Sequence, residues 1–157
     1  MSGVTLTVKR SKSLMPKIRA AFKDVEVSAG ILGSAGRHED SRESVAQVAA
    51  YNEYGTAKIP ERPAFRASFH KNRKKYLNKL IAISKKTFKT QRMKLSAFDA
   101  LGKEARNDIQ MSIAGGSWVA NAESTQLRKG KGKQLINDPL INSGQMINSV
   151  DYKVKRK

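Results

Sequence analysis

The 157-residue chain contains no cysteine, which excludes disulfide bridges, thiolate metal sites and cysteine nucleophiles. It also lacks any apolar run near the roughly 20 residues that a membrane helix needs, so we expect a soluble protein with no membrane partner. The first residues alternate between apolar and polar and do not form a signal-peptide core, so we expect no export signal and a mature chain that begins at Met1. A hydrophobic content of 39% in a chain of this length predicts one domain over residues 1–157.

Residues that build catalytic sites are scarce. The two histidines, His38 and His70, have no second ligand at a metal-binding spacing. The sequence lacks glycine-rich phosphate-binding motifs and the G-x-S-x-G motif, and the six acids between residues 24 and 53 lack the spacing of a paired-carboxylate site. We therefore predict a protein that is not an enzyme and that needs no metal or cofactor.

Acidic residues are outnumbered, because 13 Asp and Glu stand against 31 Lys and Arg, which gives a net charge of +18. Residues 58–94 contain 13 cations and one acid, whereas residues 24–53 contain six acids and two arginines. Such a charge attracts nucleic acid, an acidic protein or an anionic membrane. A solvated surface is the alternative interpretation. The candidate contacts for a DNA path or an acidic partner form two clusters: Lys71, Arg73, Lys74 and Lys75; and Arg128, Lys129, Lys131 and Lys133.

Hydropathy periods predict an α+β fold. Alternating positions predict strands at about 4–9, 25–31 and 150–154, which form a small, mostly antiparallel sheet. Helical spacing predicts helices at about 14–22, 44–54, 63–90 and 96–115 that pack with this sheet. Ser96 and Asp99 resemble a capping box, and Gly55 is expected to end the second helix as a left-handed cap. The aromatic and apolar residues of the third helix are expected to form its buried stripe.

Two segments lack any period. Residues 33–43 are small and polar and predict an exposed loop. Residues 117–142 predict an extended loop or arm with a turn or two near 121–129. Trp118 gives this arm an aromatic side chain of the kind that anchors protein interfaces, so we expect both segments to become ordered against neighbouring proteins.

The centre of the chain carries the most specific motif. Residues 52–56 read N-E-Y-G-T and residues 59–66 read I-P-E-R-P-A-F-R. This segment resembles the N-E-[FY]-G-T and I-P-x-R-P-[FA]-[FL]-R motifs of a family of tailed-bacteriophage neck and tail-completion proteins. Residues 101–113 are similar to the family's L-G-x-x-x-x-x-D-I-Q-x-x-I, and residues 128–144 resemble R-K-G…K-P-L-I-D-T-G. The chain departs from the family at residues 118–122, which lack the usual prolines, and at residues 142–143, where Asn-Ser replaces Asp-Thr.

The resemblance implies a structural protein of the virion neck. Members form part of a ring that joins the head connector to the tail and lets DNA pass. For this chain, the resemblance therefore implies a homo-oligomeric ring that contacts connector proteins and tail terminator or tube proteins. It also implies transient, sequence-independent contact with genomic DNA and assembly in the host bacterial cytoplasm. The alternative, supported by charge alone, is a sequence-independent nucleic-acid-binding protein of another class.

The motif residues are candidates for a subunit or partner interface. Arg62 and Arg66 lie one turn apart near the start of a helix, where the helix dipole disfavours cations, and this placement suggests an acidic partner. Glu53 of the same or an adjacent subunit is one candidate, and a rigid elbow with ordinary surface charge is the alternative. The full set of candidates is Glu53, Tyr54, Ile59, Pro60, Arg62, Pro63, Arg66 and Trp118.

Overall fold

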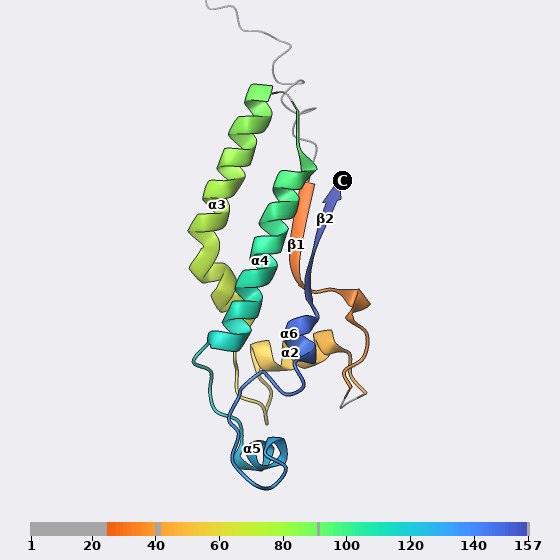
Figure 1. Ribbon diagram of the computed structural model, residues 1–157, viewed down its shortest axis with the longest axis vertical. Helices are drawn as coiled ribbons and strands as arrows, with labels where there is room; N and C mark the ends of the chain where they lie inside the picture. Colours follow the sequence, from red (N-terminus) through yellow and green to blue (C-terminus); the bar gives the residue numbers. More distant parts are fainter. Residues whose placement is uncertain (1–24, 40–41, 91, 157) are drawn as a thin grey trace, which may run out of the picture.

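A computed structural model describes residues 25–39, 42–90 and 92–156 (Figure 1). The strand expected at 4–9 and the helix expected at 14–22 lie outside these residues. Strand β1 (Val25–Ile31) pairs antiparallel with strand β2 (Val150–Arg156), in a register that places Val25 opposite Arg156 and Ile31 opposite Val150. The predicted α+β class and the strands at both ends of the described chain are therefore confirmed.

Two long helices pack beside this two-stranded sheet. Helix α4 (Leu95–Gly115) lies between helix α3 (Ala64–Thr90) and the strands (Figure 1). The buried positions of α4 recur every three to four residues, as the amphipathic pattern predicts: Leu101, Gly102, Ala105, Ile109 and Ile113. Gly102 allows the sheet to approach closely, because a Cβ at this position would lie 2.3 Å from Cδ2 of Tyr152.

The predicted helix ends need two corrections. Helix α4 begins after Lys94 without a side-chain cap, and Asp99 accepts a hydrogen bond from the Tyr152 hydroxyl at 3.1 Å instead of capping the helix. The capping box lies in helix α2 (Val45–Tyr54), where Ser44 and Gln47 bond reciprocally. Gly55 ends α2 with a φ of 72° and a ψ of 170°, which is a glycine conformation but not the left-handed helical one.

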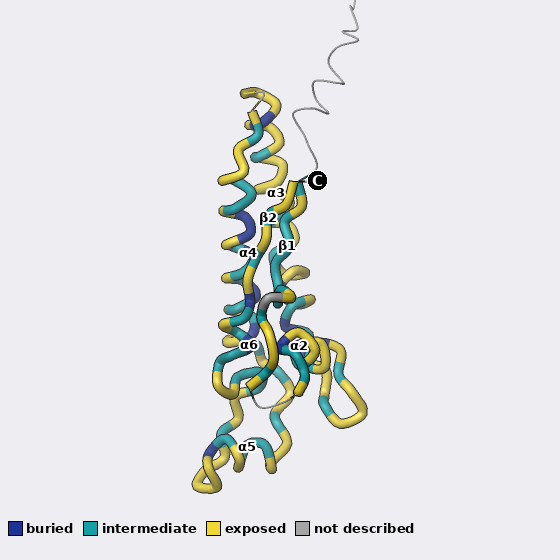
Figure 2. The backbone as a smooth tube through the Cα atoms, turned by 90° about the vertical axis from the view of Figure 1, so that its right-hand side faces the viewer, coloured by how far each residue is buried: buried dark blue, intermediate teal, exposed yellow. Residues whose placement is uncertain are grey.

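The apolar stripe of α3 does not form the predicted buried face. Phe65 packs against the core, but five other large apolar side chains are 39–53% exposed: Phe69, Leu77, Leu80, Ile81 and Phe88. The side of α3 that faces α4 is set by polar contacts, in which Lys75 and the Tyr76 hydroxyl both reach Asp108. These contacts turn the apolar stripe away from α4, and α3 remains exposed over much of its length (Figure 2).

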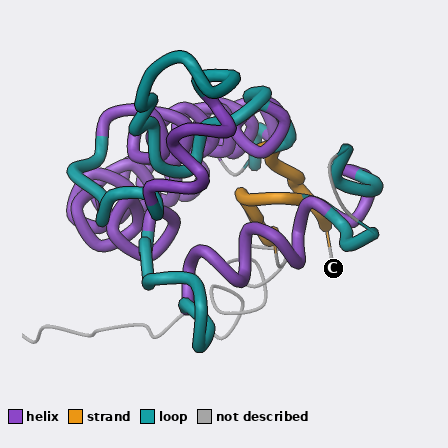
Figure 3. The backbone as a smooth tube through the Cα atoms, turned by 90° about the horizontal axis from the view of Figure 1, so that it is seen from below, coloured by secondary structure: helices purple, strands orange, loops and turns teal. Residues whose placement is uncertain are grey.

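The core lies at the lower end of the long helices. There, α2, α4, β2 and the short helix α6 (Gln145–Asn148) surround one cluster: Val45, Ala49, Ala64, Ile109, Ile113, Met146 and Val150. Figure 3 shows that loops and short helices gather at this end. Since this cluster lies at one end, the upper half of α3 contributes more to the surface than to the cluster.

The two segments without a period contain local structure. Residues 33–43 include the 3-10 helix η1 (Gly33–Ala35) and a bridge between Arg37 and Ser44. Residues 117–142 form a projecting arm that includes helix α5 (Glu123–Lys129) and folds back on itself through a Gly132 N–H bond to the Leu127 carbonyl at 2.8 Å (Figure 1). No helix within the described residues combines the length and the apolar character that crossing a membrane would require.

Candidate functional site

The motif residues form an elbow between α2 and α3, which we define as residues 52–66. The Arg62 N–H donates to the Asn52 carbonyl at 2.7 Å, and the Thr56 N–H donates to the Ile59 carbonyl at 2.8 Å, so both ends of the loop are closed. A Cβ at position 55 would lie 3.1 Å from the Glu61 nitrogen, and the φ of Gly55 is positive. The turn therefore requires glycine at this position.

Glu53 is buried in the elbow and caps α3. Its carboxylate accepts hydrogen bonds from the N–H groups of Phe65 at 3.0 Å and Arg66 at 2.8 Å, which are among the donors that a helix leaves unpaired at its N-terminus. Arg66 also pairs with Glu53 at 3.1 Å and with Glu61 at 2.5 Å, and these hydrogen bonds raise the pKa of Arg66. The acidic partner predicted for Arg66 is therefore supplied by the same chain.

Arg62 has a different environment, because its guanidinium donates hydrogen bonds to neutral oxygens. The residue is 5% exposed, and its guanidinium donates to the carbonyls of Val119 at 2.7 Å and Ala120 at 2.9 Å. Two longer bonds, each 3.3 Å, reach the side-chain oxygens of Asn52 and Asn121. Burial lowers the pKa of Arg62. Arg62 thus ties the elbow to the start of the arm, and none of its partners among the described residues is acidic.

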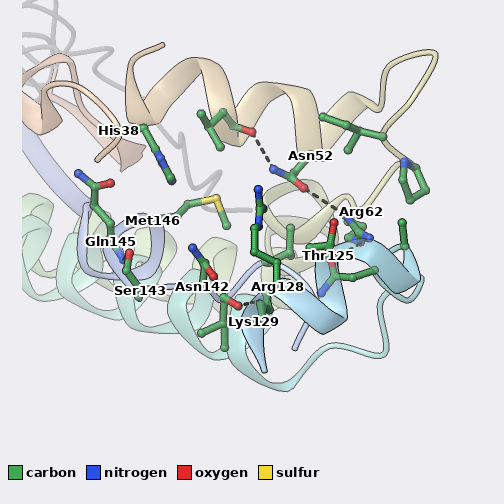
Figure 4. Close-up of a pocket in the computed structure, with 18 of the residues that line it drawn as sticks. His38, Asn52, Arg62, Thr125, Arg128, Lys129, Asn142, Ser143, Gln145 and Met146 are labelled. Atoms are coloured by element: carbon green, nitrogen blue, oxygen red, sulfur yellow. Dashed lines mark hydrogen bonds between the residues drawn. The ribbon is translucent and has the colours of Figure 1, made fainter. Parts of the chain in front are cut away.

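A pocket of about 360 Å³ lies between α2, the elbow, α5 and the turn before α6 (Figure 4). Its lining includes four cations, Lys58, Arg62, Arg128 and Lys129, and no Asp or Glu. The remaining walls mix hydroxyl and amide groups with apolar side chains. We call this site the cationic pocket.

Only two of the four cations in the second predicted cluster, Arg128 and Lys129, line this pocket. Lys129 donates to the backbone carbonyls of Asp138 at 2.5 Å and of Ile141. Burial is the main cause that lowers the pKa of Lys129. The charges of Arg62 and Arg128 also lower this pKa, whereas the charge of Asp138 raises it. Arg128 lines the pocket, and its side chain makes no hydrogen bond or ion pair with any described residue. Lys131 and Lys133 are exposed in the turn after α5 and do not line the pocket.

The four cations of the first predicted cluster also differ in their environments. Lys71, Arg73 and Lys74 are exposed and form no ion pair within the described part of the chain. Lys75 instead pairs with Asp108 at 2.5 Å and with Glu104 at 3.6 Å. Lys75 therefore helps to hold α3 against α4, while the other three cations remain available to a partner.

We define the outer face of α3 as the five exposed apolar side chains together with the cations among them: Phe69, Leu77, Leu80, Ile81 and Phe88; Arg73, Lys74 and Lys85. Arg73 lies one turn from Phe69 and from Leu77, and Lys85 lies one turn from Ile81, so charge and apolar surface share this face. The sequence does not reveal that these apolar side chains are exposed, because the same spacing is also typical of a buried stripe.

The remaining interface candidates lie at the elbow and at the start of the arm. Tyr54 is exposed, with the Arg66 guanidinium 4.8 Å above its ring, and Ile59 and Pro60 line the cationic pocket. Pro63 directly precedes α3 and is partly buried. Trp118 packs on the core and donates to the Ser112 carbonyl at 3.1 Å, so it anchors the arm to its own chain instead of standing free for a partner.

Within the described residues, no group of His, Asp and Glu side chains is placed to hold a metal ion. Comparison of the chain with known protein families, with curated proteins and with solved structures finds no match. The features of this chain that bear on function are therefore the motif at residues 52–66 and two surfaces, the outer face of α3 and the cationic pocket.

Proposed function

We propose that this protein is a structural, non-enzymatic component of a tailed-phage neck, part of a ring that joins the head connector to the tail and lets DNA pass. The outer face of α3 carries this proposal, because a stripe of five large, half-exposed apolar side chains is typical of a surface that another protein covers. The resemblance of residues 52–66 to the neck and tail-completion family supplies the kind of assembly. Formation in the bacterial cytoplasm and a final location in the virion belong to the same proposal.

The composition of the outer face favours protein assembly over nucleic-acid binding alone. Cations would suffice for sequence-independent contact with phosphates, but a DNA backbone offers no apolar surface to cover Leu77 and Ile81. Exposed Lys71 and Lys74 could still contact passing DNA. A nucleic-acid-binding protein of another class remains the second candidate, favoured by the net charge of +18.

The charge pattern favours one type of ring contact. Two copies of the outer face placed together would bring Arg73, Lys74 and Lys85 against their own equivalents, which is unfavourable. A ring built head to tail instead presents this face to a different surface of the next subunit or of a connector protein. Glu53 is not the acid in that contact, because it is buried against Arg66 of its own chain.

Assembly without nucleic acid tests the proposal. Nuclease-treated protein, alone and mixed with the connector and tail proteins of the same phage, is examined by light scattering and electron microscopy. We expect ring-shaped oligomers or a complex with those proteins. Leu77→Ser should abolish assembly, whereas Met111→Ser, which changes an apolar residue of α4 that is 73% exposed, should not.

The corresponding test in the virion removes the protein from the phage. We expect DNA-filled heads and separate tails that fail to join. Normal infectious particles without the protein would contradict the proposal, and a chain that remains monomeric and binds only nucleic acid would support the second candidate instead.

A further inference from the structure

The cationic pocket contains buried positive charge at Arg62, and no acid among the residues that line the pocket balances it. Arg62 is 5% exposed and bonds only to neutral oxygens, and the Lys129 ammonium group bonds only to two backbone carbonyls. Buried charges in proteins are normally paired with an opposite charge. The pocket lining includes no carboxylate that could fulfil this role.

The same pocket has hydrogen-bond donors without acceptors. A guanidinium has five N–H groups, and the four contacts of Arg62 leave one of them unused. The Asn121 side-chain nitrogen is buried and has no partner, while its oxygen already accepts from Arg62. Arg128 adds a guanidinium without a described partner. A ligand that only accepts hydrogen bonds and carries negative charge would complement all three groups.

Apolar walls narrow the choice of ligand. Val48, Ile59, Leu140 and Met146 line the pocket beside the cations, and its volume of about 360 Å³ exceeds that of a single small anion. We propose that the cationic pocket binds an acidic peptide segment of a partner protein, with a carboxylate near Arg62 and Arg128 and an apolar side chain against these walls. A DNA phosphate would satisfy the charge but would leave the apolar walls uncovered.

This inference goes beyond the proposed neck function. The pocket lies between α2, the elbow and α5 (Figure 4), whereas α3 carries the outer face. The pocket would accept an acidic segment whether or not the chain forms a ring. Its test therefore uses the isolated full-length chain, so that either proposal can fail without the other.

The experiment is a titration of the ¹⁵N-labelled protein followed by NMR. The probe is a blocked hexapeptide of alternating leucine and glutamate, and its matched control is the same peptide with glutamine in place of glutamate. We expect the glutamate peptide to shift the side-chain N–H signals of Arg62, Asn121 and Arg128, and to bind at least about tenfold more tightly than the glutamine peptide, because a charge-assisted hydrogen bond is lost in the control.

Two variants locate the site. Arg128→Gln should weaken binding of the glutamate peptide by about tenfold without unfolding the chain, because this side chain has no described partner to lose. Lys133→Gln removes an equal charge from the same arm but outside the pocket, and it should leave the affinity unchanged. Equal weakening by both variants would show attraction to net charge and would overturn the proposal.

Inorganic phosphate and a short DNA duplex are titrated in parallel. If either shifts the same three side-chain signals at lower concentration than the glutamate peptide, the pocket is a phosphate site and the peptide assignment is wrong. Absence of any shift with the glutamate peptide at millimolar concentration also overturns the proposal.

Discussion

Two buried charges in the elbow show how neighbouring residues of one motif acquire different roles. The Glu53 carboxylate accepts two backbone N–H groups at the start of α3 and pairs with Arg66, so its charge is satisfied within the chain. The Arg62 guanidinium, nine residues later, is surrounded by neutral oxygens. Glu53 therefore stabilises the fold, whereas Arg62 also leaves a positive potential in the adjacent pocket.

Glu53→Gln should destabilise the protein by about 2 kcal/mol, because the amide keeps the shape but loses the charge that favours a helix N-terminus and an ion pair. Urea unfolding measures the change. Glu61→Gln is the matched control, since it contacts the same Arg66 from a side chain that is 53% exposed, and it should cost less than about 1 kcal/mol. Equal costs for the two variants would contradict the capping role of Glu53.

The Tyr76 hydroxyl donates to Asp108 at 2.6 Å and gives the stability an alkaline dependence. Burial, then the hydrogen bond to Asp108, raises the pKa of Tyr76 above its ordinary value near 10. The folded state therefore keeps a proton that the unfolded chain releases above about pH 10, and the free energy of unfolding falls as the pH rises from there through the folded-state pKa.

Tyr76→Phe should cost about 1 kcal/mol at neutral pH, through loss of one hydrogen bond to a carboxylate that Lys75 still neutralises. The variant should also lose stability less steeply above pH 10 than the original protein does. Denaturation at a series of pH values measures both effects, and the exposed Tyr51→Phe should change neither. An alkaline slope that persists unchanged in Tyr76→Phe would contradict the assignment.

At the scale of elements, α4 is the central layer and depends on close contacts on both sides. Its Asp108 and Glu104 receive Lys75 and Lys79 from α3, and its Gly102 admits Tyr152 from β2. The polar contacts with α3 fix which side of that helix faces α4. The outer face of α3 is therefore a consequence of how α4 binds the opposite side.

Gly102→Ala tests the contact between helix and sheet. Alanine favours a helix interior by about 1 kcal/mol, but its Cβ would overlap the Tyr152 ring, and overpacking of this kind typically costs about 1 to 3 kcal/mol. We expect net destabilisation in thermal unfolding, together with a changed environment of the Tyr152 ring. Gly115→Ala, where nothing lies within 4 Å of the added Cβ, should remain within about 0.5 kcal/mol of the original protein.

At the scale of the whole molecule, positive charge and apolar surface are distributed over two separate sites. The main core cluster lies at one end and leaves the outer face of α3 exposed, while the cationic pocket lies near the elbow and the arm. Cations that pair within the chain, such as Lys75, are counted among the 31 Lys and Arg residues but are neutralised by their acidic partners and are not available to a polyanion. The number of Lys and Arg residues therefore overestimates the positive charge that is available to a partner.

Salt dependence separates the free cations from the paired one. If Lys71, Arg73 and Lys74 contact phosphate, changing all three to Gln should reduce the slope of log affinity for DNA against log salt concentration by up to about 3, because each contact contributes about 0.9. Both the original protein and the variant should bind DNA without sequence preference. Lys75→Gln should alter this slope little and should instead lower stability, because it breaks the contact with Asp108. An unchanged slope in the triple variant combined with lost assembly would assign these cations to a protein partner.

The sequence by itself determined the two described strands, the helices α2, α3 and α4, and the special character of the elbow. Alternation at 25–31 and 150–154 and helical spacing in α2, α3 and α4 are local signals, which is why these elements were predicted to within a few residues. Gly55, Pro63 and the charged residues of the motif also stand out in the sequence, since turns and helix starts constrain residue type locally.

Only the tertiary structure decided which faces and charges remain available. The spacing of Phe69, Leu77 and Phe88 is the same for a buried stripe as for an exposed one, and the rotation of α3 against α4 made it exposed. The neutral partners of Arg62 lie 57 and 58 residues away at Val119 and Ala120, and the pocket joins segments still farther apart. Periodicity reports what lies along one helix or strand, whereas such contacts depend on how separate segments are placed in space.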